Sequence, residues 1–156
     1  MKKIVLGLLV VFGIVLLTGC GKFDFSKASR IECEKTESNA SSTTKTTMIL
    51  AYDKNEKINN FKIDADVTYN TTMSQEAIQI TEKAMKLIGS IPGVSFESQV
   101  RDNGLYYSFS GNVSMLKVLM KQLNKDYDES KVMGDTKSEA LTELTKEGYT
   151  CKDYKK

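Results

Sequence analysis

The sequence predicts an α+β domain, an antiparallel sheet of about five to six strands with two to three helices packed on one face. Two observations predict this class. Segments in which apolar and polar residues alternate are interspersed with segments of helical period. Their order, β-β-β-α-β-β-α-α-β, groups strands with strands instead of alternating strand and helix one by one. A chain of 156 residues provides one such domain.

Three strands open the predicted sheet. Alternation begins around Ile31 and Cys33, resumes from residue 45 to 52 and is clearest from 61 to 69. In the third strand one face carries Phe61, Ile63, Ala65, Val67 and Tyr69, and the other carries Lys62, Asp64, Asp66 and Thr68. One face is therefore buried and the other solvated, as antiparallel sheets allow. The residues Asp53-Lys54-Asn55-Glu56 have the composition of a hairpin turn.

A helix and a second hairpin follow. Thr72-Met73-Ser74-Gln75 matches a capping box with Thr72 as the N-cap, and Gly89 ends the helix. The apolar positions expected to face the sheet are Ala77, Ile80, Ala84, Leu87 and Ile88. Two alternating runs, 94–100 and 105–109, flank Asp102-Asn103-Gly104 and predict a hairpin.

Two further helices and one strand complete the domain. Apolar residues recur at helical spacing at Val113, Leu116, Leu119, Met120 and Leu123. Thr136-Lys137-Ser138-Glu139 is a second capping box, and it precedes a short helix that ends at Gly148. The inward residues of that helix are Ala140, Leu141 and Leu144. The segment 149–151 is a last short strand, which would bring Cys151 beside Cys33 of the first strand.

Residues 1–19 predict an export signal. Lys2 and Lys3 precede an uncharged run, residues 4–18, that spans about 23 Å as a helix against a bilayer core of about 30 Å. The run is therefore too short for a transmembrane anchor. Leu17-Thr18-Gly19-Cys20 resembles the lipobox of bacterial lipoproteins, which implies a diacylglyceryl group on Cys20 and anchoring at the extracytoplasmic face of the cell membrane. The alternative is an ordinary secretory signal followed by a coincidental cysteine.

Residues 20–29 are then the lipidated cysteine and a short tether, and residues 30–156 form a single extracytoplasmic domain. Alternatively, Phe23 and Phe25 enter the bilayer interface. Removal of Lys2 and Lys3 from the 22 basic residues leaves 20, which equals the 20 acidic residues. This neutral balance provides no electrostatic footprint for nucleic acid.

Cys33 and Cys151 are the remaining cysteines, and they lie near the two ends of the folded region. Because extracytoplasmic thiols usually oxidise, a structural disulfide between them is the favoured interpretation. The alternative is a redox-active pair, whose cysteines usually lie close in sequence, as in Cys-x-x-Cys.

The chain contains no histidine, which excludes Ser-His and Cys-His catalysis and zinc sites that use histidine. Asp64 and Asp66 lie about 6.6 Å apart along one strand, a spacing compatible with a carboxylate-dependent hydrolase but also with ordinary surface charge, which is favoured. Residues 53–56 and 126–130 superficially resemble calcium loops, yet both lack the required Gly and closing Glu. No enzyme activity, metal or cofactor is expected.

The solvated sheet face is the candidate binding surface. Its candidate residues are Asp64, Asp66, Thr68, Glu97, Tyr106 and Ser108, beside Lys62, Gln99 and Ser110. One aromatic ring among hydroxyls and carboxylates suits a peptide or glycan. The simpler interpretation is that an antiparallel sheet needs one wet face.

The sequence resembles small bacterial envelope lipoproteins of the YehR-like family. The resemblance rests on the lipobox and on four segments: Arg30-Ile31-Glu32-Cys33, Tyr52-Asp53-Lys54-Asn55, Ile91-Pro92-Gly93-Val94 and Gly148-Tyr149-Thr150-Cys151. It implies an α+β lipoprotein fold and fits a disulfide between the outer cysteines, but it transfers no functional residues. The expected role is a membrane-anchored, non-enzymatic interaction module with an envelope partner. The alternative is an envelope protein that binds a small ligand, glycan or metal ion.

Overall fold

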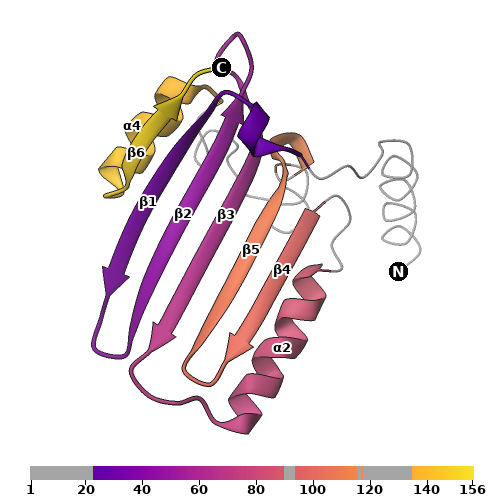
Figure 1. The fold of residues 1–156 in the computed structure, drawn as a ribbon, viewed down its shortest axis with the longest axis vertical. Coiled ribbons are helices and arrows are strands. Elements are labelled where there is room, and N and C mark those ends of the chain that lie inside the picture. Colours follow the sequence, from indigo (N-terminus) through magenta and orange to yellow (C-terminus); the bar gives the residue numbers. More distant parts are fainter. Residues whose placement is uncertain (1–22, 90–93, 116, 118–134) are drawn as a thin grey trace, which may run out of the picture.

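The chain folds into one six-stranded antiparallel sheet, seen on its face in Figure 1. The computed structural model describes residues 23–89, 94–115, 117 and 135–156. The strand order is β4-β5-β3-β2-β1-β6, and the predicted α+β class is confirmed. The elements are η1 (Phe25–Lys27), β1 (Arg30–Ser38), β2 (Ser42–Tyr52), β3 (Ile58–Tyr69), α2 (Gln75–Gly89), β4 (Val94–Arg101), β5 (Gly104–Asn112), α4 (Lys137–Lys146) and β6 (Thr150–Tyr154).

The long strand β3 lies inside the sheet, and its side chains alternate between the two faces. It pairs with β2 on one side and with β5 on the other, so that Ile63 lies between Met48 and Phe109. Phe61 and Ala65 are almost completely buried, at 0% and 1% exposure. The alternation predicted for this strand is therefore confirmed, and residues on the neighbouring strands follow it in register.

The core lies on the apolar face of the sheet. Its buried members are Ile31, Cys33, Leu50, Tyr52, Ile58, Phe61, Val113 and Ala140. The rings of Phe61 and Phe109 pack with their centroids 5.3 Å apart. Full burial of one such large apolar side chain stabilises the fold by about 1.5–3 kcal/mol, so this cluster is the main source of stability.

Two tight turns confirm the hairpins that the sequence predicts. In the β2–β3 turn the Asp53 carboxylate accepts the backbone N–H groups of Asn55 and Lys57 at 2.8 and 3.0 Å. In the β4–β5 turn Arg101 pairs with Gly104 across two residues. A Cβ atom on Gly104 would lie 2.3 Å from the carbonyl oxygen of Val67, so the neighbouring strand β3 leaves no space for a side chain.

Helix α4 begins and ends as the sequence predicts. The hydroxyl of Thr136 accepts the N–H of Glu139, and the Glu139 side chain accepts the N–H of Thr136, which completes the capping box. At the other end, Gly148 adopts a φ of 87°, which L side chains rarely adopt. Its N–H and that of Tyr149 donate to the carbonyls of Thr145 and Leu144, the pattern of a Schellman motif.

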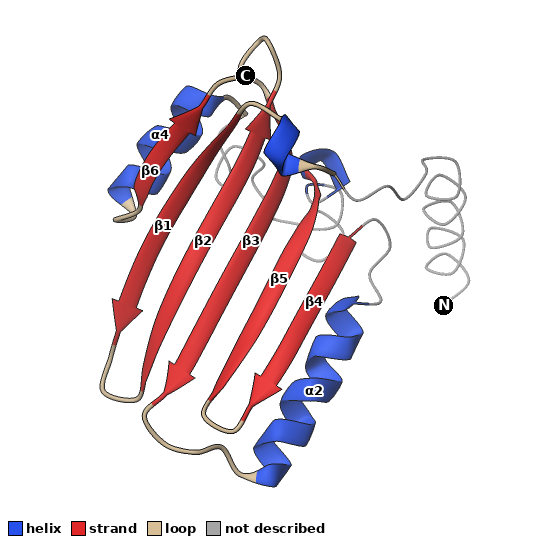
Figure 2. Ribbon diagram, viewed as in Figure 1, coloured by secondary structure: helices blue, strands red, loops and turns tan. Residues whose placement is uncertain are grey.

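The N-terminus and the inward face of α2 differ from the prediction. The hydroxyl of Ser74 accepts the N–H of Ala77 at 3.2 Å, so Ser74 caps the helix and the capping box assigned to Thr72 is wrong. Ile80 is 61% exposed, and Ala84 is also exposed. The reason is that α2 lies along the edge strand β4 (Figure 2). This strand covers only a narrow part of the helix surface, and Ile78 and Met85 are half-buried there.

Only the start of the helix predicted from Val113 lies within the described residues. Residues 113–115 are helical, and Val113 is buried in the core at 7% exposure. The other predicted inward residues of this helix lie outside the described residues: Leu116, Leu119, Met120 and Leu123. Residues 91–93, which precede β4, also lie outside them. The side chains of Leu87 and Ile88 are likewise outside them. Within the described residues, no helix is long and apolar enough to cross a membrane.

Residues 23–29, which belong to the predicted tether, are folded against the sheet. The carboxylate of Asp24 accepts the N–H of Ser26 at 3.1 Å and caps η1. The carbonyl of Ser29 then accepts the N–H of Tyr52 at 3.0 Å. Folded structure therefore begins before residue 30.

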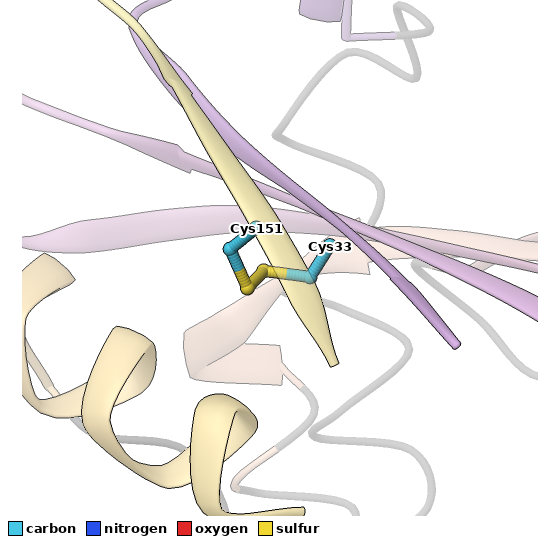
Figure 3. The surroundings of a disulfide bond; sticks show 2 residues. All are labelled: Cys33 and Cys151. Atoms are coloured by element: carbon cyan, nitrogen blue, oxygen red, sulfur yellow. A yellow bond between two sulfur atoms is a disulfide. The ribbon is translucent and has the colours of Figure 1, made fainter. Parts of the chain in front are cut away.

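The disulfide joins two strands that are far apart in the sequence. Cys33 of β1 lies directly opposite Cys151 of β6, with their Cα atoms 4.0 Å apart and their sulfur atoms 2.04 Å apart. Cys33 is completely buried, and Figure 3 shows the bond on the side of the sheet where α4 lies. The predicted pairing, and the predicted position of β6 beside β1, are confirmed.

We expect loss of this disulfide to lower the melting temperature by about 5–15 °C. The bond closes a loop with a sequence separation of 118, for which the chain-entropy model gives at most about 5 kcal/mol and typical values are about 2–4 kcal/mol. Circular dichroism melting of the wild type with and without reductant measures the effect. The Cys33→Ala/Cys151→Ala variant should melt at the temperature of the reduced wild type, and reductant should not change its melting temperature. Equal melting of oxidised and reduced wild type would contradict the prediction.

Candidate functional site

The predicted binding residues meet on the polar face of strands β3, β5 and β4. The strand register places Ser108 between Asp64 and Glu97, and it places Tyr106 opposite Asp66. Directly opposed residues have Cβ atoms about 5 Å apart. Thr68, opposite Gly104, lies exposed at one end of the group. The sheet in Figure 2 is viewed from this polar face, and α4 lies behind it.

Two side chains of this face hold the carboxylate of Asp64. Lys62, two residues earlier on the same side of β3, places its Nζ atom 2.7 Å from Oδ2. The hydroxyl of Tyr106 donates to Oδ1 over 3.3 Å. The Asp64 and Lys62 side chains are 22% and 32% exposed, so both are partly shielded from solvent. The charge of Asp64 is therefore neutralised within the face itself.

Asp66 is held from the far side of β5. Arg101, the last residue of β4, places Nη1 at 3.4 and 3.3 Å from the two carboxylate oxygens of Asp66. Both side chains are more than 40% exposed, so this pair contributes only about 0–1 kcal/mol to stability. Sequence reasoning missed Arg101, because an ion pair that spans three strands depends on a strand order that the sequence leaves open.

Ser108 is buried although it belongs to the polar face. It is 7% exposed, and its cross-strand neighbours, Asp64 and Glu97, carry longer side chains that flank it. The polar face is thus not uniformly exposed to solvent: Ser108 is buried at its centre, and Glu97 and Thr68 are exposed.

The carboxyl groups with shifted pKa values are all shifted downward in the described residues. Hydrogen bonds from Ser26 and then Lys27 lower the pKa of Asp24, and the ammonium of Lys117 lowers the pKa of Asp135. Asp153, the third such group, lies in the cluster described below. A general acid needs a raised pKa, so these shifts are opposite to that requirement.

Among the described residues, the carboxylates do not converge as metal ligands would. In the part of the chain that the structure describes, no group of three or more Asp, Glu, Cys or His residues is arranged to hold a metal ion. Asp53, in the first of the calcium-like segments, uses a carboxylate oxygen to accept the N–H groups of its own turn. The second segment, 126–130, lies outside the described residues.

A second polar cluster, which the sequence did not predict, lies at the end of β2 and β6. The Tyr52 hydroxyl donates to Asp153 Oδ1 over 2.6 Å, and Lys137 Nζ lies 3.2 Å from Asp153 Oδ2 and 2.7 Å from Glu56. Lys137 also sits over the Tyr52 ring, 5.1 Å from its centroid. Lys137 is only 8% exposed, so its charge is buried but fully paired.

The pKa shifts in this cluster follow from its contacts. Glu56 and then Asp153 raise the pKa of Lys137. Burial and the hydrogen bond to Asp153 raise the pKa of Tyr52. Burial also acts to raise the pKa of Asp153, but the Tyr52 hydroxyl and the Lys137 ammonium outweigh it and leave this pKa below its ordinary value. The cluster therefore stabilises its charged state.

This cluster connects α4 and β6 to the β2–β3 hairpin. Lys137 opens α4, Asp153 belongs to β6, and Glu56 lies in the β2–β3 turn. Backbone bonds reinforce the contact, because Lys137 N–H donates to Glu56 and Ile58 N–H donates to Asp135. Its four members come from three separate parts of the sequence, so no local sequence pattern predicts the cluster.

Comparison with known proteins adds no identification: the chain matches no known family profile, no curated protein and no solved structure.

We expect Asp153→Asn to reduce the free energy of unfolding at pH 7 by about 1–3 kcal/mol, because it removes a charged acceptor from two buried donors. The pKa of Asp153 is lower in the folded protein than in the unfolded chain, where it is about 3.9. The ionised Asp153 carboxylate therefore stabilises the fold above the unfolded pKa, and this stabilisation is lost as pH falls through the folded pKa. The variant should therefore lose less stability than the wild type between pH 6 and 3. Urea titrations across this range measure it, with the exposed turn variant Asp102→Asn as control. Parallel pH curves for wild type and Asp153→Asn would contradict the assignment.

Proposed function

We propose that this chain is a lipid-anchored extracytoplasmic module that presents the polar face of its sheet to a partner in the cell envelope. The diacylglyceryl group on Cys20 holds it at the membrane, and the domain that follows acts by binding and not by catalysis. The lipobox sequence supports the anchor, and the resemblance to YehR-like lipoproteins agrees with it.

The single observation that carries the binding role is the grouping of hydrogen-bonding side chains on three adjacent strands. Asp64, Tyr106, Ser108 and Glu97 share one face. Their carboxylates and hydroxyls are the donors and acceptors that recognise polar ligands. The pairing of Asp64 with Lys62 favours a preformed surface over a reactive carboxylate.

A glycan or other small polar ligand is the alternative occupant of this face. Tyr106 favours it, because this ring combines an apolar surface with a hydroxyl already oriented by Asp64. The two possibilities share the same residues and differ only in the size of what binds there.

We expect Cys20→Ser to abolish membrane attachment. Cells fed an alkyne analogue of palmitate should label the wild type and leave the variant unlabelled, since the thioether requires the Cys20 sulfur. Cys33→Ser is the matched control, because it also removes one cysteine but leaves the lipidation position intact. Equal labelling of wild type and Cys20→Ser would refute the anchor.

We also expect a photo-crosslinking amino acid at Thr68, on the polar face, to capture a partner on intact cells. The same amino acid at Thr145, exposed on α4, is the matched control. Asp64→Asn should weaken capture at Thr68 without changing the melting temperature by more than a few degrees, because the ion pair it removes is partly exposed. A thermal-shift panel of sugars, peptidoglycan fragments, peptides and divalent metals tests the alternative. Adducts of equal yield at Thr68 and Thr145, together with no thermal shift, would reject the binding face.

A further inference from the structure

We propose that one end of the domain docks on the bilayer surface, with Phe23 at the boundary between headgroups and acyl chains and the C-terminal lysines against anionic headgroups. This membrane-proximal end comprises Phe23, Phe25, Tyr154, Lys155 and Lys156. The inference rests on the proposed lipidation of Cys20, and it adds an orientation that a flexible tether would not give.

Exposed aromatic side chains concentrate at this end. Phe23 is 42% exposed and Tyr154 is 38% exposed, and they are two of the three large apolar side chains exposed in the described residues. Phe23 packs edge-on against Phe25, with ring centroids 4.8 Å apart, so it is held in place. Tyr is enriched at the level of the headgroups, and Phe is among the apolar residues that interfacial segments bury there.

The two ends of the described domain meet here. The hydroxyl of Ser29 accepts the N–H of Lys156 at 3.1 Å, which ties the C-terminal strand to the segment after η1. Figure 1 shows η1 and the C-terminus at the same end of the sheet, opposite the turns that join β1 to β2 and β4 to β5. The segments that carry the exposed rings and the C-terminal lysines therefore lie at the same end of the sheet.

The cations at this end are available to an anionic surface. Lys155 and Lys156 are exposed. The charge of Lys155 is the smallest of the contributions that lower the pKa of Asp153, after those of Tyr52 and Lys137. The nearby acids are already engaged. Asp24 pairs with Lys27, and Asp153 pairs with Lys137 and Tyr52. Glu56 also pairs with Lys137, and Asp53 accepts backbone N–H groups.

The short connection to the anchor favours docking. Gly21 and Lys22 are the only residues between Cys20 and Phe23, so the Cα atoms of Cys20 and Phe23 are at most about 11 Å apart. A lipidated Cys20 lies at the headgroup level, and this reach places Phe23 within the interfacial layer or just above it. An exposed Phe at that height gains by moving about 5–10 Å into the headgroup and acyl boundary.

The test uses a single tryptophan, because the chain contains none. The mature, lipidated protein is reconstituted in phosphatidylglycerol and phosphatidylcholine vesicles whose acyl chains carry bromine, which quenches tryptophan on contact. Phe23→Trp should lose most of its emission relative to unbrominated vesicles. Ile80→Trp is the matched control: Ile80 is 61% exposed on α2, so its emission should stay unchanged.

The lysine contribution has its own readout. The Lys155→Ser/Lys156→Ser change, made in the Phe23→Trp protein, should reduce the quenching in vesicles rich in phosphatidylglycerol. In the Phe23→Trp protein with both lysines intact, about 1 M salt should also reduce the quenching, because the screening length falls to about 3 Å. Lys83→Ser/Lys86→Ser on the exposed side of α2 is the matched control and should leave the quenching unchanged.

The outcomes separate this inference from the proposed anchor. Protein that floats with vesicles while Phe23→Trp stays unquenched overturns the docking and leaves the lipid anchor intact. Equal quenching of Phe23→Trp and Ile80→Trp also overturns it, because the contact would then involve no particular end. Protein that fails to float overturns the anchor, and the docking with it.

Discussion

The fold depends on the strict alternation of side chains along β3. This strand is internal to the sheet, and its register fixes β2 on one side and β5 on the other. A slip of one residue would move Phe61 out of the core and bury Lys62. The cost of exposing a large ring and burying an unpaired ammonium is several kcal/mol. Both faces of the sheet, apolar and polar, are therefore set by one strand.

Stability depends mainly on the apolar face, whereas the proposed recognition uses the polar face. The apolar face carries the buried cluster and the disulfide, and Asp153 contacts the buried Tyr52 and Lys137 at its C-terminal edge. The polar face carries partly exposed ion pairs such as Asp66 with Arg101, each of which contributes little to stability. A surface of this kind can change its side chains with little effect on the fold, and this freedom suits a surface used for recognition.

Local patterns predicted the elements, and long-range contacts decided what the patterns left open. The capping box at Thr136, the Gly148 C-terminus and the two turns were predictable because each involves neighbouring residues. The inward face of α2 was not, since its partner is the edge strand β4 and not the middle of the sheet. The cysteine pairing was predictable only because two cysteines remained after Cys20. The ion pairs of Arg101 and Lys137 join distant segments, so no sequence period reveals them.

With the proposed anchor, the geometry of the sheet also determines how a partner approaches. β3 has 12 residues and is therefore about 40 Å long at about 3.3 Å per residue. One of its ends lies near the membrane-proximal end, and the other lies by the distal turns. The distal turns are joined to one another, because Asn70 donates to the carbonyl of Ala40 and Tyr69 N–H donates to that of Asn103. A domain docked through Phe23 and the C-terminal lysines would hold its strands away from the bilayer, with the polar face turned sideways. A partner of the Asp64 and Tyr106 surface would then be another component anchored at the same membrane or a polymer that lies close above it.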